Sequence, residues 1–315
     1  MLVCAIGGAS LAQASRPDQV GPAARPAPPT SAEIDVPARE AIGKRALRRG
    51  DGAVPAPGAS RARRLFPGVR LVAVYGAPQL GATIVGQRSP SGAATEATRL
   101  ATRFTEVSTP AAQPAIDLIA TVANADPGSD GLYRTRQDPD LIEAYLAAAR
   151  EAGGRLVLDV QPGRARFIRE VKALEPFLLQ PDVDVALDPE WNVGRKGVPG
   201  VTQGSVSAKQ VNKVGRYMAG VVEANGLPQK ALFVHQFREG SITSRGKVRQ
   251  FGGQVAVTLN FDGIGSPPPK IAGYRALSAP DLFNGFSIFV SRDSNVMGFR
   301  RIAALEPHAD YVMYQ

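Results

Sequence analysis

Short apolar runs rich in β-branched residues recur along the chain from about residue 65, and amphipathic stretches separate them. A parallel strand buried on both faces is apolar almost throughout, whereas a surface helix keeps one polar face. The alternation therefore predicts repeated β-α-β units. The predicted strands are residues 71–75, 115–122, 155–160, 183–187, 231–235, 255–261, 286–290 and 311–314.

Helical periodicity fills most of the intervals between these runs. Glycine and proline mark the helix ends, as at Gly153-Gly154, Pro181 and Gly226. The predicted helices are residues 93–104, 138–152, 165–179, 208–225, a short one at 241–249, 271–277 and 296–304.

Eight strands with seven helices between them, over residues 65–315, match the length of a (β/α)8 barrel. The rival, an open doubly wound sheet, typically has a G-x-G-x-x-G turn after its first strand, but here that strand runs into Tyr75-Gly76-Ala77-Pro78. We therefore predict an α/β fold, a TIM-type barrel. A helical stretch at 31–49 is expected to cover the place of the eighth helix, which would follow the last strand.

The first 64 residues have a different composition. Residues 15–64 are rich in Pro, Ala and Arg and predict a flexible, disordered arm. Residues 1–14 are small and apolar and end in Ala12-Gln13-Ala14, the pattern of a signal-peptide remnant without its basic start. We expect an exported protein, secreted or associated with the cell envelope. Cys4 is the sole cysteine, so cleavage after Ala14 would leave no thiol.

The net charge of +9 is shared between the two regions, since residues 1–64 hold ten basic and five acidic side chains. Nucleic-acid binding requires a basic stripe interleaved with aromatic residues on a folded face, and no such stripe is found. We expect no nucleic-acid partner. Beyond residue 14 no apolar run approaches the ~18 residues that a membrane span needs, so no integral span is predicted.

Polar residues recur where the predicted strands end. In a (β/α)8 barrel the active site lies at these carboxyl ends. In an extended chain, residues two apart point the same way, which pairs Asp188 with Glu190, Asp159 with Gln161, and Asn260 with Asp262. The candidates are Tyr75, Asp159 and Gln161, then Asp188, Glu190 and Trp191, then His235 and Gln236, and finally Asn260 and Asp262.

Crowded carboxylates raise the pKa of at least one member, and a raised acid beside an ionised partner is the pair that cleaves glycosidic bonds. We assign Glu190 as general acid, Asp188 as its support, and Asp159 or Asp262 as the second carboxylate. Each has a structural alternative in a turn, a solvated loop or the core. Arg134 is a candidate ion-pair partner for the buried Asp159, and His308 is expected at the surface.

The remaining candidates are expected to bind sugar hydroxyls or stack on sugar rings: Tyr75, Gln161, Trp191, His235, Gln236 and Asn260. No H-x-x-H or C-x-x-C spacing is present, so no metal site and no cofactor are predicted. A carboxylate site for Mg²⁺ or Ca²⁺ at Asp159, Asp188, Glu190 and Asp262 is left open.

Four strings resemble a group of exported actinobacterial proteins of unassigned function: 158–164 (LDVQPGR), 186–191 (ALDPEW), 203–206 (QGSV) and 234–237 (VHQF). The resemblance covers residues 66–262 and the closing Tyr314-Gln315, and it implies an exported barrel. Asp188-Pro189-Glu190 is also similar to the D-x-E ending of chitinase-like family 18 glycosidases. In that family the Glu donates the proton and the Asp supports attack. The longer acidic series of that family is absent, since residues 183–187 offer only Asp184.

The sequence thus predicts an exported, glycoside-hydrolase-like barrel acting on an envelope or extracellular polysaccharide. Two alternatives remain. One is a non-catalytic barrel that binds carbohydrate or associates with the envelope, and the other is a carboxylate-metal hydrolase.

Overall fold

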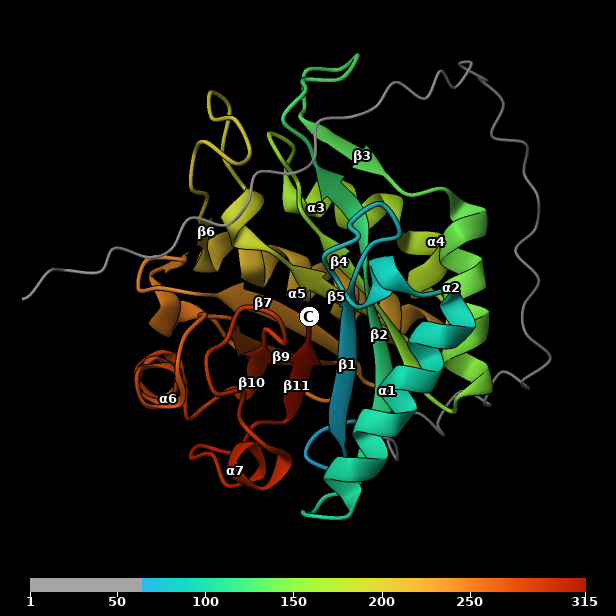
Figure 1. The fold of residues 1–315 in the computed structure, drawn as a ribbon. Coiled ribbons are helices and arrows are strands. Elements are labelled where there is room, and N and C mark those ends of the chain that lie inside the picture. Colours follow the sequence, from blue (N-terminus) through green and yellow to red (C-terminus); the bar gives the residue numbers. More distant parts are fainter. Residues whose placement is uncertain (1–63) are drawn as a thin grey trace, which may run out of the picture.

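The computed structural model describes residues 64–315, which form a closed barrel of eight parallel strands inside a layer of helices (Figure 1). Each strand pairs in parallel with the next, and the last closes the ring on the first through the register Leu71–Tyr311. The (β/α)8 TIM-type barrel is therefore confirmed. The predicted leader, the arm and the helix at 31–49 lie outside the described residues.

The barrel strands agree closely with the predicted apolar runs. They are β1 (Arg70–Gly76), β2 (Ala112–Ala123), β4 (Arg155–Val160), β5 (Val183–Leu187), β7 (Lys230–Gln236), β9 (Val255–Phe261), β10 (Phe283–Ile288) and β11 (Tyr311–Tyr314). The seventh, predicted at 286–290, begins earlier and ends at Ile288. Val290 lies beyond it, with 52 % of its surface exposed. The prediction extended the strand too far because Val290 is β-branched, a residue type that is common in strands.

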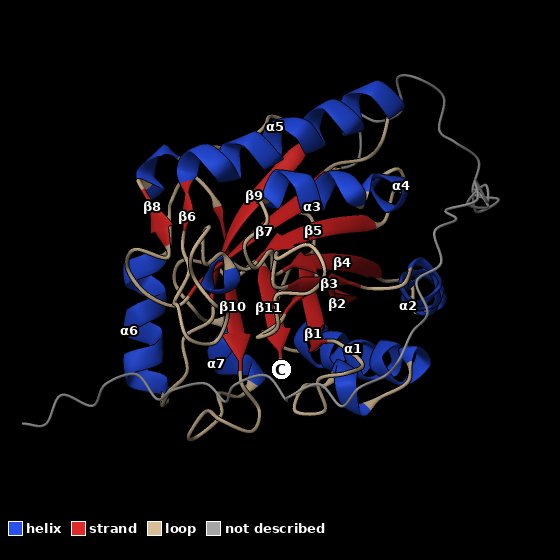
Figure 2. Ribbon diagram, turned by 90° about the horizontal axis from the view of Figure 1, so that it is seen from above, coloured by secondary structure: helices blue, strands red, loops and turns tan. Residues whose placement is uncertain are grey.

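The helices surround the strands when the barrel is viewed from above (Figure 2). Side-chain caps fix several starts: Ser207 forms a capping box with Gln210, and the side chain of Asp138 accepts from the Asp140 N–H. The α-helices are α1 (Pro90–Thr105), α2 (Pro139–Glu151), α3 (Phe167–Ala173), α4 (Glu175–Leu178), α5 (Ala208–Asn225), α6 (Pro267–Leu277) and α7 (Phe299–Ala303).

Two helix predictions are wrong in detail. The helix at 165–179 is split at Leu174 into α3 and α4, because Pro176 lacks the N–H that would continue it. Residues 241–249 form strand β8 (Ile242–Thr243) and the 3₁₀ turn η4 (Arg245–Lys247) instead of an α-helix. Ser244 adopts φ of 55°, a left-handed conformation that interrupts a helix.

Short elements stand on the loops at the carboxyl ends of the strands. β3 (Arg134–Arg136) pairs antiparallel with the end of β2, and β6 (Val206–Ser207) pairs with β8. Two further 3₁₀ turns are η2 (Val85–Gln87) and η3 (Pro189–Trp191). We call this end of the barrel the mouth and the opposite end the floor.

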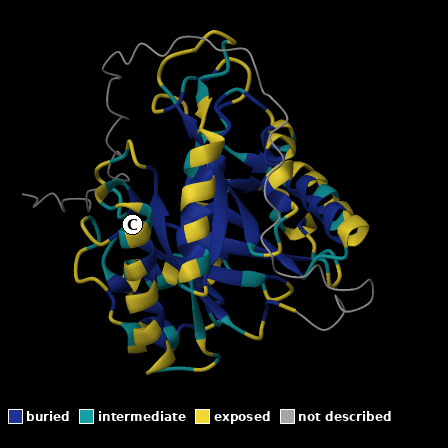
Figure 3. Ribbon diagram, turned by 90° about the vertical axis from the view of Figure 1, so that its right-hand side faces the viewer, coloured by how far each residue is buried: buried dark blue, intermediate teal, exposed yellow. Residues whose placement is uncertain are grey.

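Strand alternation divides the buried side chains into two cores. One fills the space between barrel and helices, and the other fills the barrel lumen with residues such as Ala73, Val157 and Phe233. The strands are buried while the helices expose their outer faces (Figure 3). No helix within residues 64–315 is long and apolar enough to cross a membrane.

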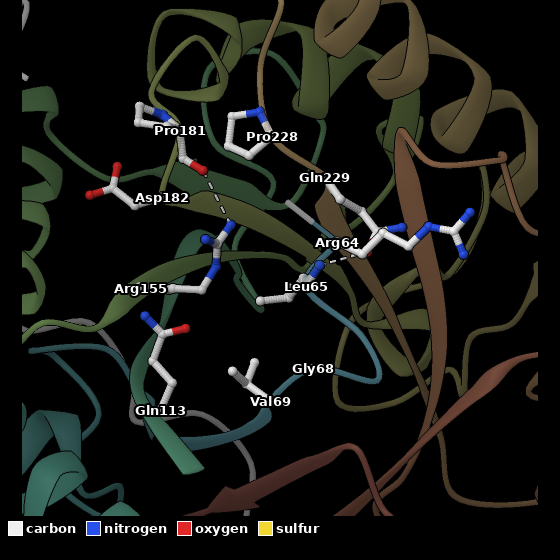
Figure 4. A pocket seen from close by; sticks show the side chains of 10 residues that line it. All are labelled: Arg64, Leu65, Gly68, Val69, Gln113, Arg155, Pro181, Asp182, Pro228 and Gln229. Atoms are coloured by element: carbon white, nitrogen blue, oxygen red, sulfur yellow. Dashed lines mark hydrogen bonds between the residues drawn. The ribbon is translucent and has the colours of Figure 1, made fainter. Parts of the chain in front are cut away.

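The floor is closed by the segment that enters β1. The Leu65 backbone N–H donates to the side chain of Gln229, and Phe66 packs against Phe283. Beside this segment lies a cavity of about 410 Å³, bordered by Gln113 and Arg155 (Figure 4). It lies at the end of the barrel opposite the predicted site.

Candidate functional site

A cluster of polar side chains occupies the mouth half of the lumen. All are at most 3 % exposed. Asp117 comes from β2, Asp159 from β4, Asp188 from the end of β5, His235 from β7, and Asn260 and Asp262 from β9 and its end.

Strand alternation explains why these side chains meet. On β4, Val157 belongs to the lumen core, so Asp159, two residues on, also points inward. The same alternation turns His235 inward after Phe233 on β7. Since neighbouring strands are in register, inward positions at one height form a ring, and the ring at the mouth is polar.

His235 is the centre of the cluster. Its Nε2 lies 3.0 Å from Asp159 Oδ2. The two atoms form an ion pair, but their angles do not meet the geometry of a hydrogen bond. Its Nδ1 lies 3.0 Å from the amide nitrogen of Asn260 and 3.8 Å from Asp262 Oδ2. The same amide nitrogen donates to Ser287 Oγ at 2.8 Å. His235 is therefore bordered by two carboxylates and one amide.

The ion-pair partner predicted for Asp159 was wrong. Arg134 instead pairs with Asp130 at 2.9 Å and with Glu170 at 3.3 Å, because β3 directs it away from the lumen. His235 takes its place beside Asp159. His308, predicted at the surface, is partly buried and contacts Arg70 Nη2 at 3.1 Å.

Asp117 is a member of the cluster that the sequence analysis missed. It is fully buried, and the Tyr311 hydroxyl donates to its Oδ2 at 2.5 Å. A signal was present, since Asp117 interrupts an apolar strand just as Asp159 does. It lies in mid-strand, whereas the candidates were sought where strands end.

Burial and mutual charge shift the proton affinities of the cluster. Burial and the neighbouring Asp159 raise the pKa of Asp117 to about 8, against the lowering effects of His235 and Tyr311. Burial alone lowers the pKa of His235, but Asp159, Asp188 and Asp262 outweigh it and raise this pKa to about 10. At neutral pH His235 is therefore an imidazolium, and Asp117 is largely protonated.

Asp188 joins this buried cluster to the rim. Burial and the charge of Asp159 raise its pKa well above the ordinary value, and Glu190 and Asp262 add to the shift. Its Oδ1 accepts from the Glu190 backbone N–H at 3.2 Å, and Gln161 donates to Oδ2 at 3.4 Å. Asp188 is thus held at both oxygens.

Glu190 does not share the direction of Asp188 by strand alternation, so that expectation was wrong. β5 ends at Leu187 and Asp188 caps η3, so residues 189–191 turn instead of extending. Glu190 and Trp191 are partly exposed at the rim. The indole nitrogen of Trp191 is buried and has no hydrogen-bond partner among the described residues.

The other predicted site residues are divided between the two faces of the strands. Tyr75 faces the lumen, and its hydroxyl accepts from Gln161 at 3.2 Å. Gln236 follows the inward His235 and lies on the outer face, where its amide donates to the Leu277 carbonyl. The structure therefore brings Tyr75 and Gln161 to the cluster and leaves Gln236 outside it.

The group best placed to hold a metal ion differs from the carboxylate set considered from sequence. Asp117, Asp159 and His235 each offer a ligand atom, and these atoms lie within 4.8 Å of one another. The open possibility at Asp159, Asp188, Glu190 and Asp262 shares only Asp159 with this group.

Comparison with known proteins adds no family. No protein-family model matches the chain, and no curated protein is significantly similar to it.

Proposed function

We propose that this barrel is an exported glycoside-hydrolase-like enzyme that cleaves an envelope or extracellular polysaccharide by carboxylate acid/base chemistry. The observation that supports it most is Asp188, a buried acid of raised pKa whose Oδ1 accepts from the backbone of Glu190 at the rim. A buried acid such as Asp188, next to the partly exposed carboxyl group of Glu190, is suited to proton transfer at the mouth.

Hydrolysis needs one group that gives a proton and one that takes a proton. Glu190 gives its proton to the glycosidic oxygen as the bond to the anomeric carbon breaks. A carboxylate of the buried set, Asp159 or Asp262, takes a proton from the attacking water or stabilises the positive charge at that carbon. Asp188 positions Glu190 by accepting its backbone N–H.

Sugar recognition is assigned to groups around this pair. Trp191 is partly exposed at the rim and is assigned to stack on a sugar ring; its buried indole N–H has no partner among the described residues and is a spare donor beside that ring. Deeper in the mouth, the buried Tyr75, Gln161 and Asn260 carry hydroxyl and amide groups that are hydrogen-bonded within the cluster. We assign them to sugar hydroxyls that enter the mouth, because neutral hydroxyl and amide groups suit a neutral, hydroxyl-rich ligand.

The test is reducing-sugar release from a panel of bacterial and plant polysaccharides. Wild type is compared with Glu190→Gln, and Glu143→Gln on the exposed face of α2 is the matched control. We expect release by wild type and by the control, and a loss of at least ~100-fold in Glu190→Gln, since general acid catalysis contributes about 10²–10⁴-fold.

The outcomes separate the alternatives. Release that survives Glu190→Gln overturns the assignment of the acid. Binding of a polysaccharide without release supports a non-catalytic carbohydrate-binding barrel. Release abolished by EDTA and restored by a metal ion supports a carboxylate-metal hydrolase.

A further inference from the structure

We infer that Asp117, Asp159 and His235 form a binding site for a divalent transition-metal ion inside the mouth of the barrel. The three side chains come from β2, β4 and β7, strands far apart in sequence. Their ligand atoms lie within 4.8 Å of one another, and none of the residues is more than 2 % exposed. This inference does not depend on the polysaccharide proposal.

The strongest indication is the unsatisfied hydrogen bonding of these groups. Asp117 Oδ1, both carboxylate oxygens of Asp159 and His235 Nε2 are buried with no hydrogen-bond partner among the described residues. His235 Nε2 and Asp159 Oδ2 face each other at 3.0 Å as an ion pair, which leaves Asp117 Oδ1 and Asp159 Oδ1 without a polar partner of either kind among those residues. Buried polar atoms without partners are costly and rare in folded proteins. A cation satisfies several carboxylate oxygens and an imidazole nitrogen together, because all of them are electron-pair donors.

The surroundings suit metal ligation as well. The Tyr311 hydroxyl occupies Oδ2 of Asp117 and leaves Oδ1 to face the cluster. A ligating histidine normally donates its other ring N–H to an acceptor that fixes its orientation. Here Nδ1 has Asn260 at 3.0 Å and Asp262 Oδ2 at 3.8 Å.

The amide of Asn260 can face His235 Nδ1 in two orientations. With the amide nitrogen toward Nδ1, it donates only to a neutral ring whose Nδ1 carries no proton. With the amide turned over, its oxygen accepts from Nδ1–H, and the Ser287 hydroxyl can donate to the same oxygen. The turned amide leaves Nε2 free of its proton for the metal.

The donor set indicates the class of ion. One imidazole nitrogen with two carboxylate oxygens favours Zn²⁺, Mn²⁺ or Co²⁺, whereas Mg²⁺ and Ca²⁺ favour all-oxygen sites. Three protein ligands leave at least one coordination position open, as in catalytic zinc sites. The metal replaces protons at His235 and Asp117, so binding releases protons and strengthens with pH.

The test measures metal binding directly on the full chain, prepared without an affinity tag. Protein dialysed against EDTA is incubated overnight with ZnCl₂, MnCl₂ or MgCl₂, because the ligands are buried. Bound metal is then counted after desalting. We expect about one Zn²⁺ or Mn²⁺ per chain, and none in Mg²⁺.

Variants assign the site. Asp117→Asn, Asp159→Asn and His235→Gln should each weaken Zn²⁺ binding at least ~100-fold, since loss of a support outside the ligand shell alone costs 10–100-fold. The chain has two histidines, so His308→Gln is the matched control and should bind like wild type. Circular dichroism checks that each variant is folded.

A second measurement needs no variant. In ¹⁵N-histidine-labelled wild type, Zn²⁺ should shift the ring nitrogen signals of one histidine and leave those of the other unchanged. Signals of both histidines unchanged, no saturable binding, or binding lost only in His308→Gln would each overturn the site. Metal bound with no polysaccharide cleaved would reject the proposed function while the site stands.

Discussion

The barrel has a buried ionic group at its floor and another at its mouth, and the polar atoms of the two groups are hydrogen-bonded to very different degrees. At the floor, Arg155 pairs with Asp184 through two contacts of 2.6 and 2.9 Å, and the Ala231 N–H donates to the same carboxylate at 2.7 Å. Nearby Lys230 donates to the carbonyls of Gln180 and Val183. Their buried polar atoms all have partners.

At the mouth, the buried charged groups are only partly paired. Asp184 lies on β5 and Asp188 directly follows the last residue of that strand, so one strand and its end contribute to both groups. The mouth cluster has carboxylates but no arginine or lysine among its members, and its one cation is His235. Several buried polar atoms of the cluster have no hydrogen-bond partner among the described residues. Complete pairing suits a structural role at the floor, and incomplete pairing suits a ligand-binding role at the mouth.

The difference between floor and mouth is tested most directly by replacing one acid in each group and comparing the loss of stability. Asp184→Asn leaves Arg155 buried without its ion-pair partner, and we expect it to lower the free energy of unfolding by about 3–5 kcal/mol. Asp117→Asn keeps the shape and an acceptor for Tyr311, and we expect a change within about 1 kcal/mol. Urea denaturation with EDTA present measures both. Equal losses would mean that the mouth cluster is as structural as the floor.

A smaller effect concerns the pH dependence of His235. Its pKa of about 10 in the fold lies above the ordinary 6.5, so its stabilisation is complete below pH 6.5 and is lost as pH rises toward 10. The advantage of wild type over His235→Gln should therefore shrink by about 1–3 kcal/mol between pH 6.5 and 10. Urea denaturation of both proteins in EDTA at several pH values measures it. A constant difference would show that the imidazole is not charged in the fold.

The floor should respond to pH in the opposite sense. Burial lowers the pKa of Lys230 to about 7 from its ordinary 10.5, although Asp184 partly opposes this. The fold therefore loses stability as pH falls from 10.5 toward 7. The free energy of unfolding of wild type should rise by about 1–3 kcal/mol relative to that of Lys230→Met as pH rises over that range. The same denaturation series tests it. If the advantage of wild type instead shrank as pH rose, as expected for His235, burial would not lower the pKa of Lys230 in the fold.

The smallest expected effect is that of Tyr311→Phe. It removes one hydrogen bond to Asp117 and should lower the free energy of unfolding by about 0.5–1.5 kcal/mol. Because that bond lowers the pKa of Asp117, the variant should also raise this pKa. Carboxyl ¹³C chemical shifts followed against pH measure the change. An unchanged titration would mean that the hydroxyl does not hold Asp117.

Much of the fold follows from local patterns in the sequence. β-branched runs predicted four barrel strands with the observed bounds, and caps such as Ser207 and stops such as Gly226 define α5. Predictions failed where one residue overrode the pattern, as Pro176 does between α3 and α4 and Ser244 does in the turn before Arg245. These are backbone effects, and they act within a few residues.

The site depended more on tertiary structure. Sequence alone determined that acids and amides stand at strand ends, and alternation placed Asp159 with Gln161 on the lumen face. It could not pair Asp159 with His235, because that contact joins β4 to β7 through barrel closure. Alternation does require His235 and Gln236 to point to opposite faces, but which of the two faces the lumen was decided by the barrel. Asp117 had a local signal as an acid inside an apolar strand, and only the structure brought it to Asp159 and His235. The sequence determined the residue types and the barrel. Only closure of the barrel decided which side chains share the lumen, because charge interactions and desolvation act between neighbours in space.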